Sequence, residues 1–199
     1  MLLEMKNYLH PHYADVACKR IATAIWDIVN KVSARIWRVK LGRECEFRGK
    51  AIFRTLPDTQ IVIGERCRFN SSHRSNLIGV YSPCMVSTLS SGAKVIIGNG
   101  CGFSGTVIAA SVEVELGDNV RCGANTLITD TDWHHGDARV GKDAPVKIGD
   151  NVWLGYGVKV LKGVTIGENS LIGAGSIVTK DIPANVIAVG NPCKEIKRL

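Results

Sequence analysis

Short apolar pairs recur along this chain at a spacing that fits neither a helix nor an ordinary strand. Between residues 146 and 179 the second member of each pair steps strictly by six: Ile148, Leu154, Val160, Ile166, Ile172 and Val178. The first member, two residues earlier, is small or β-branched: Val146, Val152, Val158, Val164, Ser170 and Ser176. Helices repeat every 3.6 residues and strands every two. A six-residue period with turn residues between the pairs is typical of a parallel β-helix built from hexapeptides. Three hexapeptides then close one three-sided coil.

The same phase can be followed towards the N-terminus. It predicts inward residues in four earlier groups: Leu41, Phe47 and Phe53; Ile63 and Phe69; Ile97, Phe103 and Ala109; Leu116, Cys122 and Ile128. Each group begins with a residue that glycine follows, and these glycines are expected at corners with positive φ. The count of six breaks at 54–60, 110–113 and 129–145, each time after the third side. We therefore expect the insertions to emerge at one edge of the prism. Region 70–94, with Leu77, Met85 and Leu89, fits either a further coil or a loop.

A different period marks residues 13–37, where apolar side chains fall at helical spacing: Ala14, Ala17, Ile21, Ile25, Ile28, Val32 and Ile36. The stripe predicts an amphipathic helix that packs across the end or side of the prism, or against a neighbouring subunit. The alternative is a helix on an anionic membrane surface, because residues 1–43 hold eight basic against three acidic side chains and include Trp26 and Trp37. In that case the protein would be membrane-peripheral.

Composition limits the classes of function. The formal net charge of +7 is concentrated in residues 1–43, and no nucleic-acid-binding motif accompanies it, so no nucleic-acid partner is expected. Seven cysteines, an odd number without a C-x-x-C motif, indicate buried free thiols in a reducing, cytoplasmic compartment. Neither a signal peptide nor a long uncharged apolar stretch is visible.

The break at 129–145 contains the candidate chemistry. It is the most polar insertion and holds His134 and His135, preceded by Asp130 and Asp132. Histidine accepts a proton near neutral pH, and a carboxylate can fix its tautomer, so either histidine suits a general base. Asp130 or Asp132 would orient the imidazole, or would only form the turn.

Four motifs give the chain a family resemblance over residues 39–199. They are GFSGT at Gly102–Thr106, ITDTDWH at Ile128–His134, IGDNVWLG at Ile148–Gly155 and IGAGSIVTKDIPANVIAVGNPCK at Ile172–Lys194. The pattern resembles the hexapeptide-repeat acyltransferases, closest to the maltose and galactoside O-acetyltransferases and to the O-acetyltransferases of capsule, colanic acid and lipopolysaccharide synthesis. The resemblance implies an all-β fold, a left-handed parallel β-helix of about six to seven coils over 39–180. A helical segment at 1–38 would precede it, and an extended tail at 181–199 would follow.

The resemblance also implies an activity: direct transfer of an acetyl group from acetyl-CoA to a hydroxyl of a sugar or polysaccharide precursor, small or lipid-linked. By that match His134 is the base and His135 the alternative. The match places the pantetheine and phosphates of the donor along seven residues: Gly155, Tyr156, Ala174, Thr179, Lys180, Lys194 and Lys197. The family's prisms resemble trimers with active sites between subunits, and no metal is required. The family's polar acceptor contacts are not recovered at Ser104 and Ser111, which leaves the acceptor open.

Three other functions remain open at this level. The acceptor could be the amine of an amino-sugar, which would make the protein an N-acyltransferase. A zinc enzyme like the γ-carbonic anhydrases shares the fold, but His134 and His135 are adjacent and only His73 could complete the ligand set from the coil region. The third alternative is a non-catalytic β-helix scaffold.

Overall fold

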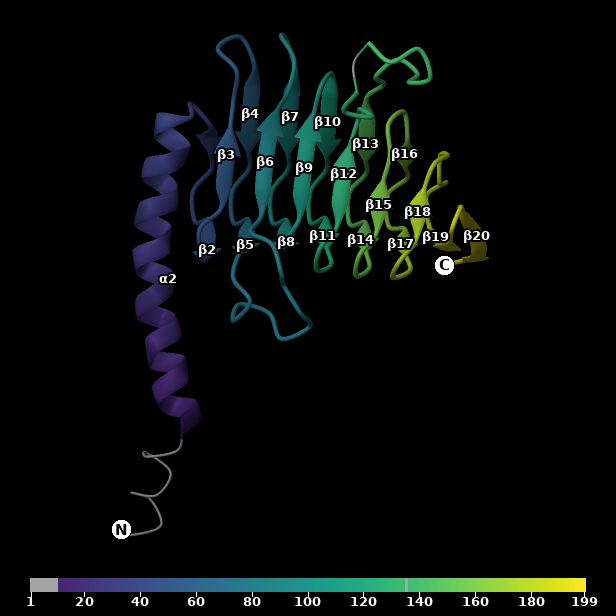
Figure 1. Ribbon diagram of the computed structural model, residues 1–199. Helices are drawn as coiled ribbons and strands as arrows, with labels where there is room; N and C mark the ends of the chain where they lie inside the picture. The colour runs from purple at the N-terminus through teal and green to yellow at the C-terminus, as the bar shows by residue number, and fades with distance from the viewer. Residues whose placement is uncertain (1–10, 135) are drawn as a thin grey trace, which may run out of the picture.

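The computed structural model describes residues 11–134 and 136–199, which form a three-sided prism of parallel strands with one helix at its N-terminal end (Figure 1). Sheet A contains, in order, β1 (Lys40–Leu41), β4 (Gln60–Ile63), β7 (Lys94–Ile97), β10 (Glu113–Leu116), β13 (Val146–Ile148) and β16 (Thr165–Ile166). Sheet B contains β2 (Glu46–Arg48), β5 (Arg68–Asn70), β8 (Gly102–Ser104), β11 (Arg121–Cys122), β14 (Trp153–Leu154), β17 (Leu171–Ile172), β19 (Val186–Gly190) and β20 (Cys193–Arg198). Sheet C contains β3 (Ile52–Arg54), β6 (Met85–Thr88), β9 (Val107–Ala110), β12 (Leu127–Thr129), β15 (Lys159–Val160) and β18 (Ile177–Val178). Three consecutive strands therefore complete one coil, and the expected hexapeptide β-helix is confirmed.

The last residues of the chain continue sheet B. A bridge from Ile166 to Ile182 begins another coil, β19 pairs in parallel with β17, and β20 returns antiparallel to β19. The segment 181–199 thus closes the C-terminal end of the prism with a two-stranded hairpin.

The inward residues stack in columns along the prism axis. The rings of Phe47, Phe69 and Phe103 stack at centroid distances of 5.0 and 4.9 Å, and the next positions of the same column are aliphatic or Cys122. All the pair residues from 146 to 178 are buried. One inward position was predicted wrongly. Ile108, not Ala109, aligns with Ile128 and Val86, because the turn at Gly105 shortens that side by one residue.

Glycine is needed at the corners for a different reason from the one expected. Gly98 and Gly149 do not have positive φ, but a Cβ at Gly98 would lie 2.5 Å from the backbone of Gly117 in the next coil. Close approach of successive coils therefore requires these glycines. The positive φ angles lie two residues further on, for example at Asn151 and Asn169, with φ of 56° and 59°. Asparagine tolerates this left-handed conformation better than most side chains.

The three insertions expected at one edge, at 54–60, 110–113 and 129–145, each follow a strand of sheet C and precede a strand of sheet A, so this expectation is confirmed. The region that the sequence left open adds a further loop at a different edge. The loop at 129–145 emerges between β12 of sheet C and β13 of sheet A, whereas residues 71–84 emerge between β5 of sheet B and β6 of sheet C. Figure 1 shows the two loops on opposite sides of the prism. The open question at 70–94 is thereby resolved: Met85 begins a coil strand, and Leu77 is 91% exposed on a loop.

Helix α2 (Pro11–Ile36) lies across the N-terminal end of the prism, against β2 and β1 (Figure 1). The predicted apolar stripe does not face the prism. Asn30 and Ala34 are buried against the first coil, while Ile21, Ile28 and Ile36 are more than 60% exposed. Within the described ranges, no helix has the length and apolar character needed to cross a membrane.

Candidate active site

Loop 129–145 brings the predicted catalytic residues to the edge between sheets C and A. Asp130, Asp132 and His134 follow β12 directly, so the coil fixes where the loop begins. His135, the predicted alternative base, falls outside the described residues.

Asp130 anchors the base of this loop. Its side chain is completely buried, and its carboxylate accepts hydrogen bonds from the backbone N–H groups of Ser111, Val112 and Glu113 at 2.6, 2.7 and 2.7 Å. Its partners are backbone amides of the segment between β9 and β10, and no hydrogen bond joins it to the imidazole of His134. Asp130 therefore fixes the edge from which the histidine projects.

Asp132 and Lys162 hold the two halves of the loop together. The ammonium of Lys162 forms an ion pair with Asp132 and donates a hydrogen bond to the carbonyl oxygen of Gly141 at 2.8 Å. Ala144 adds two backbone bonds: its N–H donates to Asp130 at 3.1 Å, and its carbonyl accepts from Gly163 at 2.9 Å. The loop is thus fastened at both ends to the coil.

His134 lies at the exposed part of this fastened loop. Trp133, just before it, has a positive φ of 67° and is 51% exposed, and Asp137 N–H donates to the His134 carbonyl at 3.3 Å. His134 is exposed, so a substrate hydroxyl approaching along this edge can reach it.

Three of the predicted donor-binding residues stack at the other edge of sheet C, where sheets B and C meet. Gly155 and Tyr156 follow β14, and Ala174 follows β17 one coil further on. A Cβ on Gly155 would lie 2.6 Å from the Ala174 amide nitrogen, and Gly175 N–H donates to the Tyr156 carbonyl at 2.7 Å. The missing side chain at Gly155 lets the backbone of Ala174 approach closely, beside the partly exposed Tyr156.

The remaining four predicted residues lie towards the C-terminal end. Thr179 and Lys180 are exposed directly after β18, at the same edge as loop 129–145. Lys194 and Lys197 are exposed on β20, which also lies against β18. The predicted donor residues therefore lie on both edges of the C-terminal half of sheet C. Within one subunit they do not come together in one cleft.

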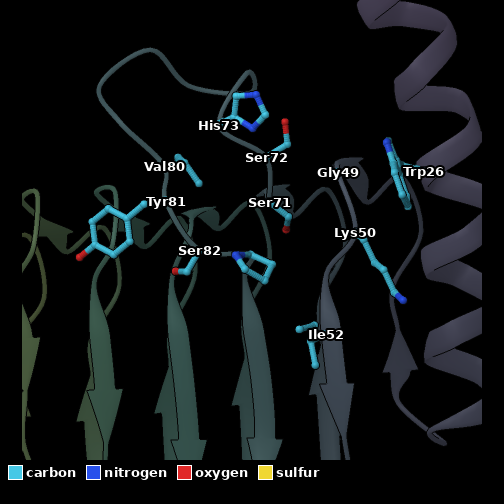
Figure 2. A pocket seen from close by; sticks show the side chains of 11 residues that line it. Trp26, Gly49, Lys50, Ile52, Ser71, Ser72, His73, Val80, Tyr81 and Ser82 are labelled. Atoms are coloured by element: carbon cyan, nitrogen blue, oxygen red, sulfur yellow. The ribbon is translucent and has the colours of Figure 1, made fainter.

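The structure also forms a hollow that the sequence did not indicate. A space of about 550 Å³ lies between loop 71–84 and helix α2, as Figure 2 shows, and His73 and Trp26 are among the residues that line it. The loop is held by Asn125, whose side-chain amide donates to the Gly79 carbonyl at 2.7 Å. In the sequence, only the length of the insertion at 71–84 could have indicated this hollow. The residues that line it come from separate coils and from helix α2, and a repeat pattern does not show which of them meet.

The arrangement of histidines bears on the zinc alternative. His73 lies on loop 71–84 and His134 on loop 129–145, at different edges of sheet C. Within residues 11–134 and 136–199, no three His, Cys, Asp or Glu side chains gather closely enough to hold a metal ion.

Comparison with known families agrees with the six-residue period. Residues 145–180 match the model for the bacterial transferase hexapeptide with six repeats. Residues 145–180 therefore contain the hexapeptide repeat that this family model describes. A galactoside O-acetyltransferase from Escherichia coli K12 is 49% identical over 90 residues, which cover 43% of this chain and 44% of that enzyme. The chain spans about half, or less, of the length of the curated relatives it matches.

Two solved hexapeptide-repeat structures complete the comparison. A maltose O-acetyltransferase from Clostridium difficile is 44% identical, covering 54% of this chain and 59% of that one, with a TM-score of 0.47. An N-acyltransferase from Bacillus cereus, solved with dTDP and coenzyme A, is 22% identical and covers 83% of this chain and 86% of that chain, with a TM-score of 0.62. The second likeness concerns the fold alone. The expected fold class, an all-β left-handed parallel β-helix with an N-terminal helix, is confirmed.

Proposed function

We propose that this protein transfers an acetyl group from acetyl-CoA to a hydroxyl of a sugar or polysaccharide precursor. The observation that carries the proposal is a fastened polar loop that presents His134 at the edge of a hexapeptide-repeat coil, in a chain 49% identical over 90 residues to a galactoside O-acetyltransferase. The free cysteines of the described chain fit a reducing, cytoplasmic setting for the reaction.

The proposed transfer is direct and needs no covalent enzyme intermediate. The His134 imidazole takes the proton of the acceptor hydroxyl, and the oxygen attacks the thioester carbonyl carbon. Backbone N–H groups of the coil stabilise the oxyanion. The C–S bond then breaks, and the coenzyme A thiolate takes the proton back from the imidazolium. His135 is the alternative base.

The donor is proposed to lie in a groove completed by a neighbouring subunit. Gly155, Tyr156 and Ala174 lie on one edge of sheet C, while loop 129–145 lies on the other, so a single prism does not bring them face to face. A trimer in which one subunit supplies His134 and the next supplies the edge at Gly155 removes this separation. Thr179, Lys180, Lys194 and Lys197 would then approach the pantetheine and phosphates, for which lysine is a point-charge partner.

The test is coenzyme A release from acetyl-CoA with a panel of sugars, amino-sugars and lipid-linked oligosaccharides. We expect His134→Ala to reduce kcat by roughly 10²- to 10⁴-fold. His73→Ala, an exposed histidine on the other loop, is the matched control and should leave kcat unchanged. If His135→Ala abolishes transfer and His134→Ala does not, the alternative base is correct.

The same panel separates the competing functions. Pairs of sugars that differ only in carrying a hydroxyl or an amine at one position distinguish O-transfer from N-transfer. Stoichiometric zinc in the purified protein, with carbon dioxide hydration and no coenzyme A release, would replace the proposal by the γ-carbonic-anhydrase-like function. A scaffold would release no coenzyme A with any acceptor and would be unaffected by His134→Ala.

A further inference from the structure

Helix α2 carries an apolar face that no other described residue of the chain covers. Ile21, Ile25, Ile28, Val32 and Ile36 are between 54% and 72% exposed, and Val29 lies beside them at 39%. Isolated exposed apolar residues are ordinary, but a continuous stripe along one helix marks a contact surface. We call these six residues the outer face of α2.

The opposite side of the helix is fixed to the prism by polar groups. Asn30 is fully buried; its side-chain oxygen accepts from Ala51 N–H at 2.8 Å, and its side-chain nitrogen donates to the Gly49 carbonyl at 3.0 Å. Asp27 accepts from Phe47 N–H at 2.6 Å. Rolling the helix to bury its isoleucines would break these bonds and leave backbone groups of the first coil unpaired. The outer face is therefore held outwards.

Basic side chains border the outer face on one side. At about 100° per residue, Arg20, Lys31 and Arg35 fall along one flank of the isoleucine stripe. All three are exposed. The acidic groups of the described helix are occupied elsewhere, since Asp27 faces the prism and Asp15 pairs with Lys19 at 2.6 Å. An apolar stripe with a positive flank is complementary to a surface that is apolar beneath and anionic on top.

The position of the helix keeps this face available. Helix α2 lies at the N-terminal end of the stack of coils, and no other described element lies on its far side (Figure 1). Its 26 residues give a length of about 39 Å, enough for a long in-plane contact.

We propose that the outer face of α2 lies in the interface of an anionic lipid bilayer, with Arg20, Lys31 and Arg35 at the headgroups. A lipid surface fits better than a second copy of this helix, because the acidic groups of the described helix are already bound by Lys19 and by the Phe47 N–H, so a second copy offers the positive flank no free anionic partner. The inference does not rest on the proposed acetyl transfer. It would place an acetyltransferase at the membrane where a lipid-linked acceptor is held.

Vesicle binding by the full chain tests the proposal without any activity measurement. Wild-type protein should float with vesicles of phosphatidylcholine and phosphatidylglycerol and bind pure phosphatidylcholine weakly. Ile21→Ser combined with Ile28→Ser should reduce the partition coefficient by roughly tenfold or more, because two apolar side chains leave the interface. Leu77→Ser with Ile78→Ser removes two exposed apolar residues from loop 71–84 and is the matched control, expected to bind as wild type.

The charge contribution is measured separately. Lys31→Gln combined with Arg35→Gln should weaken binding to the anionic vesicles by roughly fivefold per charge, while binding to phosphatidylcholine changes little. Circular dichroism and thermal unfolding confirm that each variant keeps its fold, which is expected because every substituted side chain is exposed.

A native cysteine reports the orientation of the bound helix. Cys18 is exposed and in line with Ile25 and Ile36, whereas the other six cysteines are buried. Its alkylation by a water-soluble maleimide should slow several-fold when anionic vesicles are added, and not with phosphatidylcholine. Failure of wild-type protein to bind anionic vesicles, or equal binding by the Ile21/Ile28 variant, overturns the proposal. An assembly in solution that halves in mass in that variant, without vesicle binding, would assign the face to a second copy.

Discussion

The side-chain oxygen of Asn30 accepts a hydrogen bond from the backbone N–H of Ala51 at 2.8 Å, so a fully buried amide joins helix α2 to the first coil. The first coil has no preceding coil to cover its end. Asn30 and Asp27 supply acceptors for two of its backbone N–H groups, at Ala51 and Phe47. The helix thus caps the prism through hydrogen bonds and the packing of Ala34 and Trp26, while its isoleucines stay outside.

Asn30→Ala should destabilise the protein by about 3 kcal/mol, because it leaves the Ala51 N–H and the Gly49 carbonyl buried without partners. Urea unfolding followed by circular dichroism measures the change. Lys31→Ala, the exposed neighbour, should stay within about 0.5 kcal/mol of wild type. Equal stability of the two variants would mean that α2 does not cap the coil.

A glycine at a coil corner should be far less tolerant than a glycine within a strand of the same coil. Gly98→Ala places a Cβ 2.5 Å from the Gly117 backbone and should cost roughly 1 to 3 kcal/mol. Gly102→Ala meets nothing within 4 Å and has no positive φ, so its effect should be within about 0.5 kcal/mol. Thermal unfolding of the two variants measures this difference. Equal midpoint temperatures would contradict the close approach of successive coils at Gly98.

Loss of the Lys162 ammonium should loosen loop 129–145. Lys162→Met removes the bonds to Asp132 and Gly141, so we expect faster tryptic cleavage after Arg139 and Lys142. If the loop carries the base, kcat should also fall by about tenfold with an unchanged KM for acetyl-CoA, because positioning is lost. Stability should change by no more than about 1 kcal/mol, since Asp132 is exposed to solvent and such ion pairs contribute little.

The control for this prediction is Lys147→Met, which removes an ion pair of 3.2 Å with Glu115 on sheet A. It should alter neither cleavage nor kcat. Unchanged proteolysis of Lys162→Met would show that the ion pair does not restrain the loop, whatever the outcome for activity.

The native protein should present one reactive thiol of its seven cysteines, that of Cys18. Burial raises the pKa of the Cys84 and Cys122 thiols, so they are neutral as well as shielded at neutral pH. Titration with a chromogenic disulfide should therefore give one equivalent before denaturation and seven after it. Cys18→Ser should abolish the native reaction, and further fast-reacting thiols would show that the prism opens.

The sequence by itself determined the coil, because the inward residues recur every six positions. This period can be recognised without knowing any contact between coils. It also indicated the loop at 129–145, where the period stops, and the helix before residue 38. Only the tertiary structure decided which face of that helix meets the prism, that Ile108 replaces Ala109 inside, and that residues 71–84 emerge at a second edge. It also decided that Asp130 serves backbone amides and that Asp132 pairs with Lys162. These outcomes depend on partners about 20 to 30 residues away, one or more coils along the prism, and a periodic pattern does not specify contacts between coils.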